Sequence, residues 1–402
     1  MIKGCSNLIY ISLLLFYPYI SISQSRILIT SDFPGGNIEV LSIDDDTIRL
    51  KTDNSFTEGE WFYWYFRVSN MAGRKITFKF EQENVFARYG PAYSINNDQA
   101  WKWYGENRIK DNGFTFSFAN SDSIAYFCMA FPYVEQNLIS YLSTLQNREN
   151  LKIDTLCNSP EGRAIQKITI KPVRHDAEHK VLITARHHAC EMMASYVMEG
   201  IIGSILNDNN CSPLRENAEF IFIPFIDKDG VENGDQGKNR IPRDHNRDYL
   251  EESIHHSTAA LRNTVPEWSD NKLKIAIDLH CPWIHSGINE TIYVVGNSDP
   301  AIEKQQIIFS NLLEKNTTGD LKLYHKDFIP FGTSWNTADN YTKGRSFAKW
   351  AGTLVGVHLA CTIEFPYANV SGIPVTKDGA REFGKAVAYS IVEYLDSIDN
   401  RK

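Results

Sequence analysis

His188 and Glu191 form a His-x-x-Glu pair whose two side chains could converge on one metal ion. The pair follows an apolar run at residues 181–183, which is typical of a strand, and precedes one at 192–206, which is typical of a helix. An imidazole and a carboxylate on such a strand-to-helix loop supply two of the three protein ligands that a catalytic Zn²⁺ usually has.

A third ligand and a base are available further along the chain. His280 ends a second apolar run that begins at Ile275, and Glu364 ends a third at residues 356–363. Asp278 lies two residues before His280 on the same face of an extended strand, where it either orients the imidazole or simply caps the strand end. Two ligands on one loop, a third on another strand and a separate carboxylate match what a water-activating zinc hydrolase requires.

Other histidines compete with these ligands. His187 could replace His188, but its spacing to Glu191 is one residue too long for the motif. The remaining histidines of the second half are expected at the surface or in packing, namely His245, His255, His256, His285 and His358.

Further segments carry a resemblance to a known family. In order along the chain these are residues 61–70, 126–133, 156–162, 185–191, 227–231, Arg240 with 243–247, and 362–364. With them, the chain from Glu60 onward resembles the zinc carboxypeptidases of the carboxypeptidase A-like (funnelin) family. The likeness is closest to the cytosolic carboxypeptidase subfamily, in which a small β domain precedes the catalytic domain.

The resemblance implies a role for each site residue. Zinc lowers the pKa of a bound water, and Glu364 would take its proton during attack on a peptide carbonyl and pass it to the departing amine. Arg240 matches the family arginine that stabilises the oxyanion. Asn246 and Arg247 match the pair that binds the free C-terminal carboxylate of a peptide. Tyr341 is the candidate for the tyrosine beside that carboxylate.

Three departures from the subfamily pattern lie close to the expected substrate. Residues 188–191 read His-Ala-Cys-Glu instead of His-Pro-Gly-Glu, residues 281–284 replace a Gly-His-Ser-like continuation, and Arg240 and Asn246 are unusually close in sequence. The ligands and the base are unaffected, but the preferred terminal residue is not predicted. Cys190 and Cys281 flank zinc ligands, so they should be neighbours, either as a disulfide or as free thiols.

Composition and the N-terminus set broader limits. A chain of 402 residues is expected to form two domains. The formal net charge of −8, without a Lys/Arg-rich block, argues against a nucleic-acid partner.

A signal peptide is predicted over residues 1–23. The features that predict it are Lys3, the apolar residues 8–20, and the small residues Ser21 and Ser23. The mature protein would then be secreted or periplasmic, without stable membrane insertion.

Residues 26–165 are expected to form an all-β sandwich closed by a helix at 135–145. Its strands are indicated by alternating aromatic and β-branched runs at 61–68, 75–80, 114–118 and 124–131. The aromatic side chains of this part, including Trp101 and Trp103, either form a carbohydrate-binding face or, as we expect, pack in the core and between domains.

Residues 167–402 are expected to form an α/β domain with a mixed, mostly parallel central sheet. Apolar strands at 181–184, 220–223, 274–277, 291–295 and 356–363 alternate with helical patterns at 192–206, 301–313 and 378–395. The proposed ligands fall at strand ends, where the active sites of such domains gather.

The sequence therefore predicts a zinc metallocarboxypeptidase that holds one Zn²⁺ and removes C-terminal residues from peptides with a free carboxylate. One alternative is hydrolysis of cell-wall peptides or N-acyl amino acids by the same zinc machinery. The other is a non-catalytic protein that retains the fold to bind a peptide or a glycan. The sequence does not predict the oligomeric state.

Overall fold

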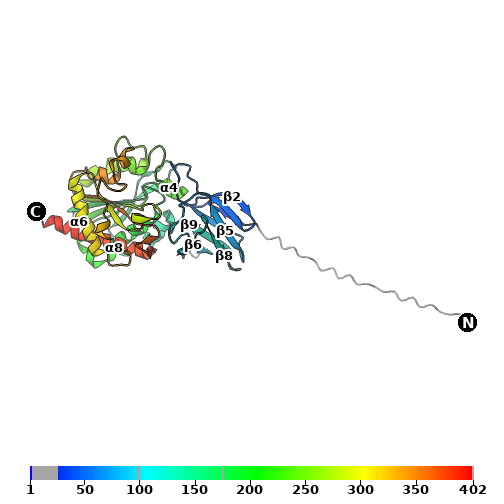
Figure 1. Cartoon of the computed structure of the whole chain (residues 1–402). Helices are drawn as coiled ribbons and strands as arrows, with labels where there is room; N and C mark the ends of the chain where they lie inside the picture. The colour runs from blue at the N-terminus through cyan, green and yellow to red at the C-terminus, as the bar shows by residue number, and fades with distance from the viewer. Residues whose placement is uncertain (2–25, 97–99, 174–175, 401–402) are drawn as a thin grey trace.

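The computed structural model describes residue 1 and residues 26–96, 100–173 and 176–400. An N-terminal β part packs beside a larger α/β part (Figure 1). Apart from its first residue, the predicted signal peptide lies outside the described residues. Among the helices that the structure describes, none combines the length and the apolar character needed to cross a membrane.

The N-terminal part contains two sheets. The first has the strand order β1-β4-β9-β6-β7 and the second β2-β3-β5-β8. The first sheet is formed by β1 (Leu28–Thr30), β4 (Tyr65–Ser69), β9 (Ile124–Cys128), β6 (Ala92–Ile95) and β7 (Lys102–Trp103). The second is formed by β2 (Glu39–Asp44), β3 (Thr47–Lys51), β5 (Lys75–Phe80) and β8 (Gly113–Ser117).

Alternating side chains make these sheets a sandwich. In β5, Ile76, Phe78 and Phe80 are buried while the residues between them are not, because successive strand side chains point to opposite faces. The Phe78 ring centroid lies 5.4 Å from that of Phe66 and 5.3 Å from that of Phe127, both in the other sheet. These ring contacts between the sheets form the core of the N-terminal part.

The α/β part is built on a seven-stranded sheet of order β10-β11-β13-β12-β14-β16-β15. Its strands are β10 (Leu151–Asn158), β11 (Ala164–Ile170), β12 (His179–Ala185), β13 (Ala218–Ile223), β14 (Leu273–His280), β15 (Tyr293–Val295) and β16 (Leu359–Glu364). The central pairs are parallel, whereas β10, β11 and β15 join antiparallel at the edges. The predicted fold class, a β-rich domain before an α/β domain with a mixed sheet, is confirmed.

Helices cover this sheet (Figure 1). The longer helices are α2 (Met192–Asn207), α5 (His256–Ser269), α6 (Pro300–Asn316) and α8 (Lys377–Asp399). The shorter ones are α1 (Glu135–Thr144), α3 (Ser212–Asn217), α4 (Lys228–Asn233) and α7 (Phe347–Ala351). The remaining short elements are β17 (Asn369–Val370), β18 (Ile373–Pro374) and 3-10 turns at Asn209–Cys211, His245–Arg247, Gly287–Glu290, His325–Asp327 and Ala338–Tyr341.

Two glycines let α2 and α8 pack closely. A Cβ on Gly200 would lie 2.0 Å from the carbonyl oxygen of Arg381, and one on Gly384 would lie 2.1 Å from that of Val197. No side chain fits at such a separation. Helix α2 is therefore buried along almost its whole length, and it carries the metal-ligand loop at its N-terminal end.

The N-terminal sandwich ends, and the α/β sheet begins, earlier in the chain than the sequence predicts. Residues 26–165 were expected in the sandwich, but β10 and β11 pair with each other, and β11 pairs with β13 of the α/β sheet. Their alternating pattern suits an edge strand of either sheet, so only the hydrogen bonds distinguish the two. The boundary falls between β9 and β10, and α1 lies in the connection.

The two parts are joined by specific contacts. Trp103 packs on Phe131 of the same part, with ring centroids 4.5 Å apart, and its indole Nε1 donates a hydrogen bond across to the carbonyl oxygen of Val375 at 2.6 Å. Arg88 binds Glu290 through Nε at 2.8 Å and through a terminal nitrogen at 2.6 Å. Trp103 thus packs between the domains, as expected, instead of forming a carbohydrate-binding face.

Candidate metal centre and substrate pocket

The register of three parallel strands gathers the predicted site. His280 is the Cα partner of Glu364 on the adjacent strand β16, and Ala185 at the end of β12 pairs with Leu279. The loop that carries His188 therefore begins beside His280. Because carboxyl ends of parallel strands meet at one edge of a sheet, segments far apart in sequence meet there.

Arg186 shapes the loop that follows β12. Its backbone has a φ of +60°, a left-handed conformation uncommon for residues other than glycine. Its guanidinium is buried and donates to the carbonyl oxygens of Ala189 and Tyr133, both at 2.9 Å, and to Ser195 Oγ at 3.1 Å. These bonds hold the turn that presents His188. This role could not be predicted from the sequence, because a single arginine after a strand carries no pattern.

His188, Glu191 and His280 meet at one point. Glu191 Oε1 lies 2.9 Å from His188 Nδ1, and Glu191 Oε2 lies 2.8 Å from His280 Nδ1. The ligand atoms of the three residues all lie within 4.8 Å of one another. Glu191 is fully buried, yet its Oε2 accepts no well-directed hydrogen bond from the described part of the chain. This arrangement suits atoms aimed at a shared ion, and two histidines with one glutamate form a set that zinc prefers.

The ionised state of Glu191 also suits a bound cation. Burial opposes its ionisation, but Lys238, His280 and His188 together hold the pKa of Glu191 well below its usual range. A buried carboxylate that remains ionised can bind a dication without first releasing a proton.

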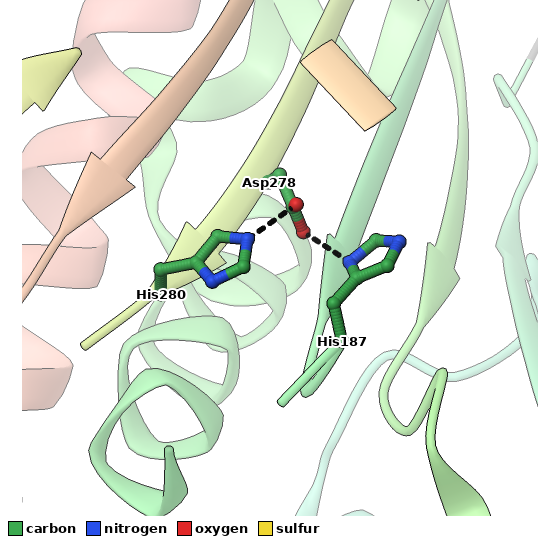
Figure 2. Close-up of side chains that lie close together, drawn as sticks. All are labelled: His187, Asp278 and His280. Carbon is green, nitrogen blue, oxygen red and sulfur yellow. Dashed lines mark hydrogen bonds and ion pairs between the residues drawn. The ribbon is translucent and has the colours of Figure 1, made fainter. Parts of the chain in front are cut away.

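Asp278 orients the third ligand. Figure 2 shows its carboxylate between His280 and His187. His280 Nε2 lies 2.5 Å from Oδ2, while His187 Nδ1 and Thr184 Oγ1 each lie 2.8 Å from Oδ1. Because the Nε2 atom of His280 is engaged by Asp278, its Nδ1 atom is directed at Glu191 and the metal position.

Both ring nitrogens of His187 have partners in the core. It forms a second possible metal-binding group with Asp278 and His280. However, its Nδ1 bonds to Asp278, and its Nε2 lies 2.8 Å from the hydroxyl of Tyr249 (Figure 2 shows the Asp278 contact). Both ring nitrogens are therefore engaged, so His188 remains the ligand that fits.

We predict that Asp278→Asn weakens zinc binding by about 10–100-fold. The uncharged amide cannot hold both imidazoles in their orientation or stabilise them as the carboxylate does. The zinc dissociation constant, measured by competition with a chelator, tests this. The exposed Asp320→Asn is the control with the same chemical change. A folded Asp278→Asn protein with unchanged zinc affinity would contradict the orienting role.

Glu364 faces the same pocket from the end of β16. Its side chain is buried, and Oε2 accepts no hydrogen bond within the described residues. Burial raises the pKa of Glu364, although His280 and Lys238 act in the opposite direction. An unengaged carboxylate with a raised pKa is suited to accept and release a proton.

A pocket of about 370 Å³ opens above these groups. Six residues predicted from the sequence line it: His188, Asn246, Arg247, His280, Tyr341 and Glu364. Trp61, Trp283 and Trp335 also line it and were not predicted. The rings of Trp61 and Trp283 lie 5.0 Å apart, so the segment before β4 contributes to the wall.

Arg247 is held in place at the pocket. Its Nε donates to the carbonyl oxygen of Asn340 at 3.0 Å, and a terminal nitrogen donates to that of Asn246 at 2.8 Å. The guanidinium lies 5.2 Å from the ring centroid of Tyr341. Asn246 is fixed in turn, because its Oδ1 accepts from the backbone N–H of Phe347 at 2.9 Å.

Residues 29–130 match the family model described as the cytosolic carboxypeptidase N-terminal domain, and residues 138–257 match that of the zinc carboxypeptidases. The chain belongs to the zinc carboxypeptidases. Zinc is the metal of this family, and His188, Glu191 and His280 fit it. The second match ends before His280 and Glu364, whose placement is shown by the strand register.

Relatives and solved structures agree with this family. Bovine cytosolic carboxypeptidase 3 is 28% identical over 332 residues, which cover 71% of this chain and 32% of that protein. A metallo-carboxypeptidase from Burkholderia cenocepacia has a TM-score of 0.76 at 20% identity and covers 93% of this chain and 100% of its own. One from Pseudomonas aeruginosa, in complex with (2-guanidinoethylmercapto)succinic acid, has a TM-score of 0.72 at 19% identity, covering 92% and 99%. The structural likeness shows the carboxypeptidase fold.

The prediction of a secreted or periplasmic protein is contradicted by these comparisons. The family model for the N-terminal domain and several of the matched relatives, among them human cytosolic carboxypeptidase 6, are described as cytosolic. That prediction depended on Lys3 and the apolar residues 8–20, which report local hydrophobicity and lie outside the described residues.

Arg240 does not enter the pocket of this carboxypeptidase fold. Its guanidinium is held by Asp227 at 2.5 Å and Asp235 at 2.7 Å, and it lines a different cavity. Its backbone forms a bridge with Thr57 of the N-terminal part. The expected approach of Arg240 to the metal is therefore not what the structure shows.

The two cysteines beside the ligands are free thiols. Cys190 and Cys281 are both fully buried and not joined to each other. The Cys190 sulfur lies 3.3 Å from the hydroxyl of Tyr367 and accepts from Gln236 Nε2 at 3.0 Å. Of the two arrangements left open by the sequence, the structure shows the reduced one.

Proposed function

We propose that this chain is a metallocarboxypeptidase that releases residues from the C-termini of peptides. The observation that carries the proposal is one pocket lined by His188, His280, the carboxylate of Glu364 and the guanidinium of Arg247. Glu191 converges with the two histidines as a third possible zinc ligand. Because the chain spans only 32% of the bovine relative, its activity is inferred from its own site.

The zinc site and Glu364 would have different roles in the reaction. Zinc held by this site would lower the pKa of a water and polarise the scissile carbonyl. Glu364 accepts the proton of the attacking water and delivers it to the nitrogen of the departing residue. Burial raises the pKa of Glu364, so the first transfer, from water to Glu364, costs less than it would to an exposed carboxylate.

Arg247 selects substrates that end in a carboxylate. A planar guanidinium binds a carboxylate through paired hydrogen bonds, and Arg247 is already oriented by backbone carbonyl groups. Asn246 and Tyr341 complete this end of the pocket. The Pseudomonas aeruginosa structure contains a succinic acid derivative, which is a dicarboxylic acid, and this supports recognition of carboxylates.

We predict that Arg247→Gln raises KM for a peptide by about 10–100-fold with a smaller change in kcat, because hydrogen bonds to a charged group are lost. Initial-rate kinetics on one peptide measure both constants. The same peptide with a C-terminal amide is the matched control. The unmodified protein should cleave this amide peptide poorly, and Arg247→Gln should lower its rate of cleavage only slightly further. An equal loss on both peptides would contradict carboxylate recognition.

Mass spectrometry of a mixed peptide library tests the function. Zinc-loaded protein should shorten peptides from the C-terminus one residue at a time, and a chelator should stop it. Muropeptides and N-acyl amino acids are assayed in parallel. Turnover confined to those compounds would favour the amidohydrolase, while peptide binding without turnover would indicate a binding protein.

A further inference from the structure

The pocket contains a cation to which the sequence analysis assigned no role. Lys238 lines the pocket, and its side chain is only 14% exposed. Its Nζ atom donates to Glu191 Oε1 at 2.5 Å and to the carbonyl oxygen of Cys281 at 2.8 Å. Lys238 thus reaches a metal ligand on one side and the residue after the third ligand on the other.

The backbone around Lys238 is fastened to the metal-ligand loop. The Cys190 N–H donates to the carbonyl oxygen of Gln236 at 3.1 Å. Gly237 has a φ of +80°, and a Cβ there would lie 2.3 Å from the amide nitrogen of Ala189. A glycine is therefore required for this close approach. Lys238 follows directly, so its side chain starts beside the ligands.

The chain turns away from the pocket after Lys238. Asn239 has a φ of +49°, which breaks the extended path that would place residues 238 and 240 on the same side. Its carbonyl oxygen accepts from the N–H of Glu58. The carboxylates of Asp227 and Asp235 then hold the Arg240 side chain outside the pocket.

We propose that Lys238 supplies the positive charge that stabilises the carbonyl oxygen of the scissile peptide bond, the role expected of Arg240. An ammonium group has three N–H donors, and Glu191 and Cys281 use two. Within the described residues the third has no partner in the chain, and the side chain borders the pocket. It is available to the substrate.

This inference rests on the proposed peptide hydrolysis, and its chemistry balances. The water oxygen forms a bond to the carbonyl carbon, its proton passes to Glu364, and negative charge collects on the carbonyl oxygen. Lys238 stabilises that charge without giving up its own proton. The carbon–nitrogen bond then breaks, and Glu364 returns the proton to the amine. A donor directed at the developing charge lowers the barrier more than it strengthens substrate binding.

Three variants test the roles of the two cations separately: Lys238→Met, Lys238→Arg and Arg240→Gln. Lys238→Met is expected to lower kcat by about 10²–10³-fold with little change in KM. Lys238→Arg should recover part of this loss, because it restores a charged donor. Arg240→Gln, checked for folding by its melting temperature, should keep kcat within a few-fold. Zinc content is measured for every variant.

Inhibitor binding provides a readout independent of turnover. A phosphonate peptide analogue places a tetrahedral charged group where the transition state forms, whereas the planar second carboxylate of benzylsuccinic acid resembles the reaction product. Lys238→Met should lose at least about tenfold more affinity for the phosphonate than for the dicarboxylic acid.

The outcomes distinguish this inference from the proposed function. An active protein whose Lys238→Met variant keeps its kcat would overturn the role of Lys238 alone. Loss of zinc, with parallel losses for both inhibitors, would also overturn it and would show that Lys238 only pairs with Glu191. An unmodified, zinc-loaded protein that hydrolyses no peptide would overturn the proposed function itself.

Discussion

Peptide hydrolysis by the Glu364→Gln variant is expected to be about 10²–10⁴-fold slower in kcat than that of the unmodified protein. The amide has nearly the same size and shape, but it cannot accept the proton of the attacking water. Because Glu364 is not one of the three convergent ligands, zinc content and affinity for the dicarboxylic inhibitor should be retained. Initial rates together with metal analysis test this expectation.

The exposed Glu382→Gln on α8 is the matched control, since it makes the same chemical change on the outer surface. Its kcat should equal that of the unmodified protein. A Glu364→Gln protein that holds zinc and retains its rate would refute the assignment of the base. A protein that binds peptides equally well with either residue and never turns them over would be a binding protein.

Replacing His188 with asparagine is expected to remove zinc and turnover together. His188 is one of three ligands, and its Nδ1 faces Glu191 at 2.9 Å. The metal stabilises the transition state by several kcal/mol, so the loss in rate should be about 10³-fold or more. Chelation of the unmodified protein should give the same loss, and added Zn²⁺ should reverse it only in that protein.

His256→Asn is the control for this change, because His256 is exposed, and its ring lies within hydrogen-bonding distance of the carbonyl oxygen of Asn158, away from the metal position. It should retain one zinc per chain and full activity. Full zinc occupancy in the His188→Asn protein would mean that another group holds the metal, and His187 with Asp278 and His280 would then be the alternative.

The candidate zinc ligands could be predicted because local sequence determines where each one lies. His280 and Glu364 end apolar strands, and His188 follows one, so an alternating α/β order places all of them at one sheet edge. The register then sets His280 directly opposite Glu364. Asp278 was also accessible to this reasoning, since period-two alternation puts it on the same face as His280.

Other features depend on contacts between distant segments. The β10–β11 hairpin could have joined either sheet, and its pairing with β13 decides the domain boundary. Trp61 reaches the pocket only because the sandwich packs against the loop that carries Trp283. Arg186 fixes the ligand loop through acceptors in three different segments.

By itself, the sequence determined the fold class and the candidate metal ligands and base, because these follow from strand and helix periodicity and from residue chemistry. Only the tertiary structure decided which cation lines the pocket. Lys238 and Arg240 are two residues apart, and the left-handed backbone of Asn239 and the carboxylates of Asp227 and Asp235 send them to different cavities. The position of each charged side chain depends on the groups that it bonds to, and these groups come together only when the chain folds.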